Sequence, residues 1–256
     1  MKHFSESEQC QLDLSFVRRQ GQTLLDRRIF TYPYVLMRTF REPAANVQVG
    51  SEKASRLTAM VQNSSGPIHD RDHLRVNLAL DAATNVHLTY QGATAVLRAR
   101  SGNTSRERLS ISLGEGAHLS YLPEARIYFP DARHQQVTDI ALSTGSTLLF
   151  VDSFTVHDPE NQARPLAELD NTLTIRRDGE TALLDRQHLE TPSFSQRFRA
   201  FASLLLIGYP QPQLPEIPHL YAAVSALPSN LGWGIRLAAP DLRPIRAAVE
   251  QVASRW

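Results

Sequence analysis

The residues best suited to chemistry lie together at positions 69–73, where the sequence reads HDRDH. This segment supplies two imidazoles, His69 and His73, and two carboxylates, Asp70 and Asp72. The two histidines would share one face on a strand and also on a helix. Imidazole and carboxylate ligands suit Zn²⁺, Ni²⁺ or Co²⁺, so the segment is a candidate metal site. The alternative is a solvated polar turn that follows the residues NSSGP.

Other motifs of catalysis or cofactor binding do not occur in the sequence. It contains neither HExxH nor CxxC, and it has no GxxxxGK[ST] or GxGxxG loop for a phosphate group. Glu115, Glu124 and Asp131 could supply paired carboxylates, but such chemistry needs a defined separation that the sequence leaves open. We therefore expect a protein that is not an enzyme and that binds no cofactor permanently.

The composition indicates which binding partners and which cellular compartment to expect. The 27 basic residues nearly cancel the 26 acidic ones, so the formal net charge of +1 does not favour nucleic acid or an anionic membrane. Cys10 is the single cysteine, which excludes an internal disulfide and fits a reducing compartment. No apolar run reaches the length of a membrane helix, and the first residues do not resemble a signal peptide. These features predict a cytoplasmic protein.

Three segments, 74–90, 108–122 and 137–151, repeat one pattern of alternating apolar residues, a small or polar break, and a return to apolar residues. In each, the apolar residue after the break follows the last one before it by six positions. These anchor pairs are Leu80 and Val86, Leu113 and Leu119, and Leu142 and Leu148. Alternation with a period of two buries one face of each strand. A recurring hairpin-like unit that cannot cover its own apolar face predicts stacked β layers.

The flanking segments extend this pattern. Residues 12–19 and 23–30 predict a hairpin around Gly21, and residues 171–189 predict another that turns at Asp178-Gly179. Two stretches without alternation, 41–60 and 158–169, are expected to be loops.

The pattern of apolar and polar residues changes after about residue 195. Residues 198–210 fit a buried strand or a short helix, residues 214–227 are expected to turn helical after Pro218, and residues 233–239 fit a strand. Asp241 is expected to cap a final helix. Its apolar face comprises Leu242, Ile245, Val249, Val252 and Trp256.

The predicted fold is therefore mainly β. We expect one domain over residues 1–256, with a layered β-helical body over 12–190 and a small C-terminal α/β portion over 195–256. That C-terminal portion is expected to contain about two helices.

Several segments taken together resemble one known family. The segments GPIHDRDHLRVNLAL, HLTYQGATAVLRA, LSISLGEGAHLSYLPEARIYFPDA and LTIRRDGETALLDRQHL follow the order and spacing of the urease accessory protein UreD, also called UreH. The resemblance extends from about Leu12 to Leu189 and more weakly to Trp256. The residues that match the family's motifs are Gly66, Gly92, Thr94, Arg98, Pro123, Glu124 and Asp131.

The resemblance implies a layered β-helical fold with C-terminal helices and a role without catalysis. UreD-like proteins act with UreF and the GTPase UreG on urease apoprotein, so that Ni²⁺ reaches the urease active site. An internal passage through the β fold is thought to carry the ion, and transient Ni(II) binding is therefore expected. In this family, Pro123 and Pro130 would lie at strand ends, where a ladder N–H is not needed, and Glu124 and Asp131 would project from corners.

This sequence departs from the family pattern in its loops. Asp70 and Arg71 occupy two glycine places of a glycine-rich loop, and Ala95 and Leu97 replace a lysine and an aromatic residue. A later Gly-Arg…Gly-Glu motif falls at positions that here are Val156, His157, Asn161 and Gln162.

Two functions follow from this comparison of motifs. The first is a maturation scaffold that passes Ni²⁺, with Asp72 as the best-matched polar residue and His69, His73 and Asp70 as further ligands along the ion path. The second is an interaction protein that shares the UreD fold but serves another assembly without nickel transfer.

Overall fold

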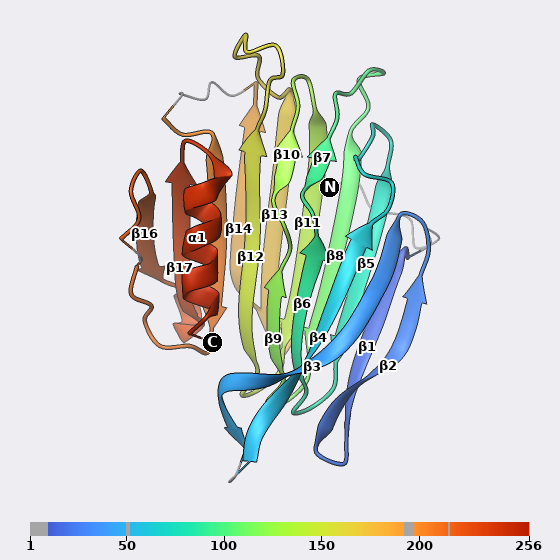
Figure 1. Cartoon of the computed structure of the whole chain (residues 1–256), viewed down its shortest axis with the longest axis vertical. Coiled ribbons are helices and arrows are strands. Elements are labelled where there is room, and N and C mark those ends of the chain that lie inside the picture. Colours follow the sequence, from blue (N-terminus) through green and yellow to red (C-terminus); the bar gives the residue numbers. More distant parts are fainter. Residues whose placement is uncertain (1–9, 50–51, 192–196, 215, 256) are drawn as a thin grey trace.

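A computed structural model describes residues 10–49, 52–191, 197–214 and 216–255, and it consists mainly of strands in two facing sheets (Figure 1). The first sheet, here called sheet A, follows the order β14 (Glu180–Glu190), β13 (Glu168–Arg177), β11 (Arg133–Leu142), β8 (Ser105–Leu113), β5 (His73–Leu80), β1 (Leu12–Arg19) and β2 (Gln22–Phe30). Sheet B follows the order β16 (Tyr221–Ala226), β17 (Gly232–Ala239), β15 (Ala200–Ile207), β12 (Thr147–Val156), β9 (His118–Leu122), β6 (Asn85–Gln91), β4 (Glu52–Asn63) and β3 (Tyr34–Val49). Two short strands, β7 (Thr94–Val96) and β10 (Arg126–Tyr128), pair with each other, and β10 also pairs with β12.

The repeated segments stack as parallel layers, in agreement with the layered fold predicted from sequence. In sheet A, Leu80 pairs with Leu113, which pairs with Leu142. The partners in sheet B are in register too, since Val86 pairs with Leu119 and Leu119 with Leu148. The anchor residues of the sequence repeat are therefore direct neighbours on successive layers.

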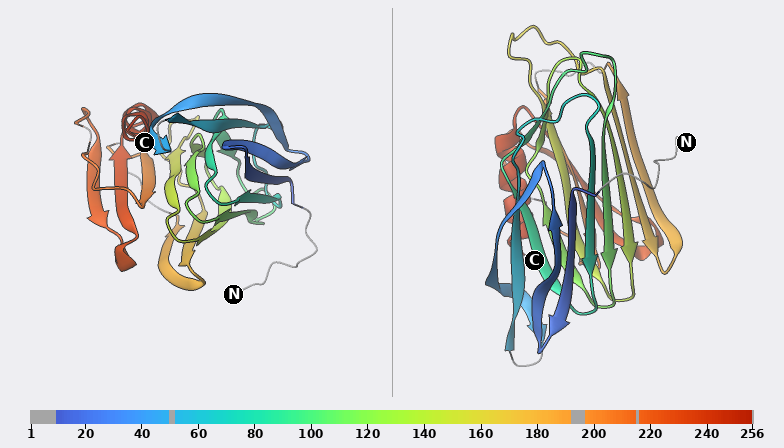
Figure 2. Two further views of the ribbon diagram at one scale, coloured as in Figure 1. Left: turned by 90° about the horizontal axis from the view of Figure 1, so that it is seen from below. Right: turned by 90° about the vertical axis from the view of Figure 1, so that its right-hand side faces the viewer.

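Each repeat unit differs in one respect from the hairpin-like form expected. Its two strands do not pair with each other, because β5, β8 and β11 lie in sheet A whereas β6, β9 and β12 lie in sheet B. The break between them is an arch that carries the chain from one sheet to the other (Figure 2). Close packing of the arches requires Gly114, since a Cβ there would lie 2.7 Å from the backbone nitrogen of Ala82 in the preceding arch.

True hairpins close the ends of the sheets. β1 and β2 pair antiparallel, as do β13 and β14, and both hairpins were predicted. The expected loop over 41–60 is wrong, because β3 and β4 form a long antiparallel ribbon. Leu57, Ala59 and Val61 alternate on β4 and are buried, so the end of this segment carried a strand signal that its polar beginning obscured.

The C-terminal portion contains one α-helix in the described chain, not two. The segment expected to become helical after Pro218 forms β16, which pairs antiparallel with β17. Pairing with an open strand edge outweighs the helix propensity of its alanines. Residues 198–210 resolve to the buried strand β15, and a short 3-10 turn, η1 (Pro228–Asn230), precedes β17.

Helix α1 (Leu242–Ala253) begins where it was predicted and covers the outer face of sheet B (Figure 1). The carboxylate of Asp241 caps it by accepting a hydrogen bond from the backbone N–H of Arg243 at 2.8 Å. Ile245 and Val252 are buried against sheet B, together with Ala248, whereas the expected contact of Trp256 lies outside the described residues. The one α-helix described is too short to span a lipid bilayer.

Candidate functional site: a polar interior between the sheets

The inner face of sheet A changes from polar to apolar along its strands. Leu109 and Ile140 belong to the apolar half, and both are buried between the sheets. Toward the starts of the same strands, the alternate positions that share this inner face are polar. The buried polar residues there are Ser105, Glu107, His134, Gln136 and Thr138. One half of the interior is therefore an apolar core, and the other half contains hydrogen-bonding and charged groups.

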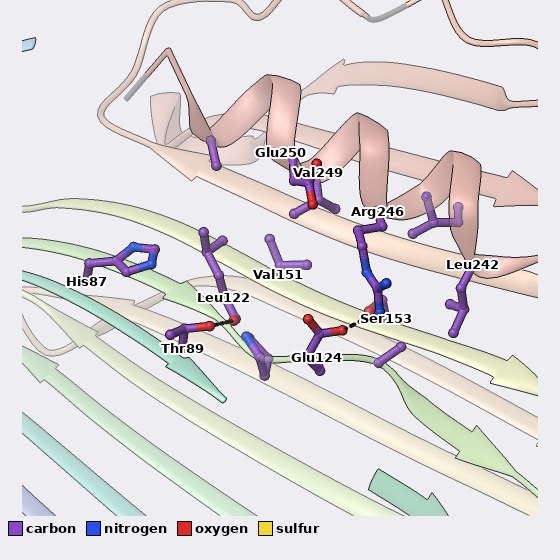
Figure 3. Close-up of a pocket in the computed structure, with 14 residues that line it drawn as sticks. His87, Thr89, Leu122, Glu124, Val151, Ser153, Leu242, Arg246, Val249 and Glu250 are labelled. Carbon is purple, nitrogen blue, oxygen red and sulfur yellow. Dashed lines mark hydrogen bonds and ion pairs between the residues drawn. The ribbon is translucent and has the colours of Figure 1, made fainter. Parts of the chain in front are cut away.

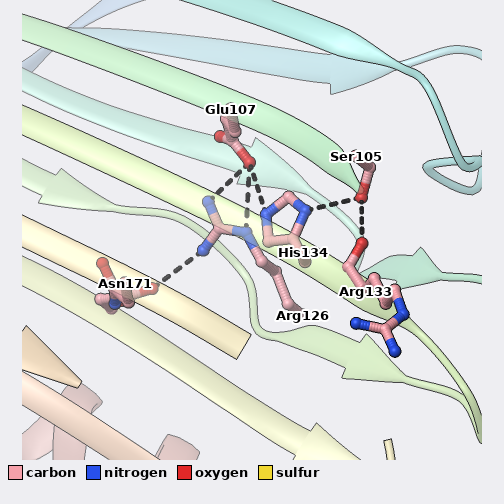
Figure 4. A network of polar contacts seen from close by, with 7 residues as sticks. Ser105, Glu107, Arg126, Arg133, His134 and Asn171 are labelled. Atoms are coloured by element: carbon pink, nitrogen blue, oxygen red, sulfur yellow. Dashed lines mark hydrogen bonds and ion pairs between the residues drawn. The ribbon is translucent and has the colours of Figure 1, made fainter. Parts of the chain in front are cut away.

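Arg126 of β10 enters this polar half from sheet B and bridges two carboxylates (Figure 4). Its Nε and Nη2 donate to Oε2 of Glu107 at 3.2 and 3.0 Å, and its Nη1 donates to Oδ1 of Asp152 at 2.8 Å. The other oxygen of Asp152 accepts from the amide of Asn171 at 2.6 Å. With one guanidinium and two carboxylates, the cluster has a formal charge of −1 in a place with little access to water.

Burial and neighbouring charge set the protonation states of Arg126 and His134. Burial opposes the charged form of Arg126, but Glu107 and Asp152 outweigh it and raise the pKa of the guanidinium above its usual value. Burial, assisted by the positive charge of Arg126, lowers the pKa of His134 to about 3. His134 is therefore neutral at physiological pH, beside a permanently charged arginine.

A small cavity of about 30 Å³ lies against this cluster, large enough for a water molecule. Glu107 and Arg126 form one side of it. Thr94, Pro123 and Glu124 contribute to another side, although they come from different strands and connections. The polar cluster is therefore reached through residues that the family resemblance singles out.

A larger groove of about 220 Å³ lies beside the small cavity, beneath helix α1 (Figure 3). The two share Pro123 and Glu124. Oε2 of Glu124 accepts a hydrogen bond from Nη2 of Arg246 at 2.9 Å, which ties the β9–β10 corner to the helix. Glu124 thus stands at the junction between the surface groove and the interior.

Two further cavities continue from the other side of the cluster. One of about 10 Å³ is lined by Asp152, Asn171 and Ser203, among others. It shares Asp152 and Ser203 with a cavity of about 580 Å³ that lies between β14 and the strands β15 to β17. Hollows that share lining residues therefore succeed one another on each side of the cluster, from the groove under α1 to this opening, and Arg126 stands between the two sets.

The HDRDH segment forms a turn before β5. Oδ2 of Asp72 accepts from the backbone N–H of His69 at 2.8 Å, and Asp70 accepts from the N–H of Ser101 at 3.1 Å and from its hydroxyl. His69 and His73 are exposed. The turn is held by its own carboxylates, and the preceding residue, Ile68, lines the small cavity.

The remaining motif residues shape turns and corners. Gly66 and Gly92 have φ values of +79° and +86°, which suit glycine. Pro123 follows the end of β9, as predicted. Arg98 is exposed and its backbone bridges to Ala132, next to the exposed corner residue Asp131.

The central residues Glu107, Arg126, His134 and Asp152 were not selected from the sequence. A signal was present, since Glu107 and His134 fall in phase with the buried leucines and isoleucines of their own strands. Polar residues at core positions of a strand indicate a satisfied interior network. Their contact with Arg126 and Asp152 crosses from one sheet to the other, and no spacing along the chain encodes it.

Comparison with known proteins shows the family of this chain. The family model described as UreD urease accessory protein matches residues 8–256. The chain belongs to the UreD family. Urease accessory protein UreD 2 of Bradyrhizobium sp. (strain ORS 278) is 40% identical over 258 residues, covering 95% of this chain and 87% of that protein. The corresponding protein of Bradyrhizobium sp. (strain BTAi1 / ATCC BAA-1182) is 40% identical over 265 residues, covering 98% and 90%.

Similarity extends to more distant members of the UreD family. Urease accessory protein UreD 1 of Methylorubrum populi is 30% identical over 258 residues, covering 94% of this chain and 85% of that protein. These names describe accessory proteins of urease, not catalysts. The altered loops noted in the sequence therefore occur within a chain that spans 85–90% of the length of these three relatives.

Proposed function

We propose that this UreD protein acts with UreF and UreG on urease apoprotein and assists the delivery of Ni(II) through its polar interior. The observation that carries the proposal is the succession of cavities with charged residues in their walls, from the groove under α1, past Glu124 and the Arg126 cluster, to the opening beside β14. An apolar interior would have served stability better, since buried charge is costly to desolvate.

The charges along this route suit a divalent cation. Glu124 lies at the groove, and Glu107 and Asp152 lie at the centre. Asp185 lines the 10 Å³ cavity on the far side of Arg126. Carboxylate and imidazole groups that are scattered rather than gathered bind Ni²⁺ weakly at each point, so an ion can enter and leave. The net charge of −1 at the centre attracts a cation and repels anions.

The HDRDH turn is proposed to take part at the outer end of this route. His69, Asp70, Asp72 and His73 lie in the turn that begins beside Ile68, a wall residue of the small cavity. Exposed imidazoles next to carboxylates would collect an ion from solvent or from a partner and hold it briefly.

A second candidate function is that of a UreD-fold interaction protein that assembles another complex without nickel transfer. One observation favours it: Arg126 separates the two sets of cavities and neutralises part of the interior charge. In that case the polar interior would only fix the packing of the two sheets.

Urease activation separates the two functions. Ser203 is a small residue that lines both cavities on the far side of Arg126, so Ser203→Leu would obstruct the route. The variant is co-expressed with urease and its other accessory proteins, and urease activity and co-purified partners are measured. Ser112→Leu on the exposed outer face of β8 is the matched control.

We expect Ser203→Leu to lower urease activity at least tenfold while UreF and the urease subunits still co-purify, and Ser112→Leu to leave both unchanged. Full activity of a folded Ser203→Leu variant would overturn the interior route. Failure of the wild-type chain to co-purify with urease components would overturn the role in urease assembly and support the second function.

A further inference from the structure

His134 is buried completely and is held in one orientation by its Nδ1 atom (Figure 4). This nitrogen lies 2.9 Å from the hydroxyl oxygen of Ser105, and the same hydroxyl donates its hydrogen to the backbone carbonyl of Arg133 at 2.9 Å. A serine hydroxyl has a single hydrogen, so toward His134 it acts as the acceptor. Nδ1 of His134 therefore carries the proton.

The other ring nitrogen of this neutral imidazole is then a bare acceptor. Nε2 of His134 has no hydrogen-bond partner among the described residues, and Oε2 of Glu107 faces it at 3.8 Å. Two lone-pair atoms thus face each other in a buried place with no proton between them. A buried acceptor without a partner is uncommon, because its lost hydration is not replaced.

The separation of these two atoms suits a shared metal ion. First-row divalent ions lie about 2.0–2.2 Å from imidazole nitrogen and carboxylate oxygen, so two ligand atoms on one ion are separated by roughly 3–4 Å. One imidazole with one carboxylate is a ligand pair for Ni²⁺, Zn²⁺ or Co²⁺.

Arg126 hydrogen-bonds the carboxylate oxygen of Glu107 that would bind such an ion. Its Nε and Nη2 both donate to Oε2 of Glu107, whereas its Nη1 contacts the separate carboxylate of Asp152. The guanidinium can therefore release Glu107 and keep Asp152. One positive group would replace another at Glu107, so the buried carboxylate is never left without a counter-charge.

We infer that Nε2 of His134 and Oε2 of Glu107 bind one first-row divalent cation in the interior, and that Arg126 takes the place of this ion when the site is vacant. The inference deepens the proposed function and rests on it for the identity of the ion as Ni(II). Competition by Arg126 keeps the site weak, and return of the guanidinium to Glu107 expels the ion.

A second group of residues that could bind a metal ion provides an internal comparison. Glu168, His188 and Glu190 lie together on the β13–β14 hairpin, with ligand atoms within 4.8 Å of one another. Nε2 of His188 is 3.4 Å from Glu168 and 3.5 Å from Glu190. These residues are partly exposed, and Glu168 is also paired with Arg133, so the cluster could bind ions independently of the interior.

The test measures NiCl₂ binding to the full chain by equilibrium dialysis, with variants at each cluster. His134→Asn retains an amide that can donate to Ser105 but has no atom at the position of Nε2. His188→Ala removes the imidazole of the surface cluster. Circular dichroism and thermal unfolding establish that each variant is folded.

We expect the interior equivalent of weakly bound Ni(II), counted beside any ion at the HDRDH turn or the surface cluster, to be present in the wild type and in His188→Ala and to bind at least tenfold more weakly in His134→Asn. Paramagnetic Ni(II) should also broaden the imidazole resonances of His134. Arg126→Met, which removes the competing charge, should bind Ni(II) at least tenfold more tightly.

Unchanged binding in a folded His134→Asn variant would overturn the inference, as would loss of binding in His188→Ala alone. No detectable binding in the wild type or in Arg126→Met would also overturn it. If these results came with normal urease activation in cells, the proposed function would stand without an ion site at His134.

Discussion

Arg126 and Glu107 form a two-nitrogen, one-oxygen contact that connects sheet B to sheet A through the polar interior. Nε and Nη2 of the guanidinium lie 3.2 and 3.0 Å from the same carboxylate oxygen. Both side chains are about nine-tenths buried, with 10% and 9% exposure. Each group therefore depends on the other to replace the water it has lost.

Glu107→Gln should destabilise the protein markedly. The change removes the charge that balances Arg126 while keeping the size of the side chain, and breaking one partner from a buried ion pair costs about 3–5 kcal/mol. Urea unfolding followed by circular dichroism measures this loss. The matched control is Glu124→Gln, which breaks an exposed pair with Arg246 and should cost less than about 1 kcal/mol. Equal effects of the two substitutions would contradict the importance of burial.

His134 should make the stability fall as the pH is lowered through mildly acidic values. Its folded-state pKa of about 3 lies below the unfolded value near 6.5, so protons bind preferentially to the unfolded chain. The stabilisation is complete above pH 6.5 and is lost as the pH falls toward 3, at roughly 1.4 kcal/mol per pH unit.

The comparison for this prediction is His134→Asn, which does not titrate. Between pH 7 and pH 5, the wild type should lose about 2 kcal/mol more of its unfolding free energy than the variant. His87, whose pKa is lowered to about 4 by burial, contributes in the same direction to both proteins. Parallel pH profiles for the two would show that His134 is protonated without unfolding.

Gly114 should not tolerate alanine. The added Cβ would lie 2.7 Å from the backbone nitrogen of Ala82, and because the neighbour is backbone, the two arches would have to separate. Overpacking of this kind costs about 1–3 kcal/mol. The nearby Gly116 has open space around it and a φ of +61°, which asparagine accepts, so Gly116→Asn is the control. Thermal unfolding should show a lower Tm for Gly114→Ala than for Gly116→Asn.

The HDRDH turn is tested by combining Asp72→Ala with His69→Ala. If these residues collect Ni(II), urease activation in cells should fall while the protein remains folded. Because Asp72 also holds the turn through the N–H of His69, Asp72→Asn alone is a useful comparison, since its amide oxygen can still accept that bond. Normal urease activation in cells that carry the double variant would show that these residues are not part of the ion path.

The sequence by itself determined the repeated strands and their layering. Alternation with a period of two is a local property, and the spacing of Leu80, Leu113 and Leu142 already contained the register that the three layers adopt. The turns at Gly21 and Asp178-Gly179, and the cap at Asp241, were predictable for the same reason, because each depends on a few adjacent residues.

Two segments whose structure depends on a distant neighbour were predicted incorrectly. β16 forms because the edge of β17 offers hydrogen bonds, although its alanines favour a helix. The ribbon of β3 and β4 likewise forms by mutual pairing and by the parallel contact of β4 with β6.

Only the tertiary structure decided which polar residues of the two sheets meet in the interior. Glu107 and His134 come from two strands of sheet A, while Arg126 and Asp152 come from two strands of sheet B. Their charges are close only because the two sheets face each other at these residues. Pairing between the sheets depends on distance in three dimensions rather than on position along the chain.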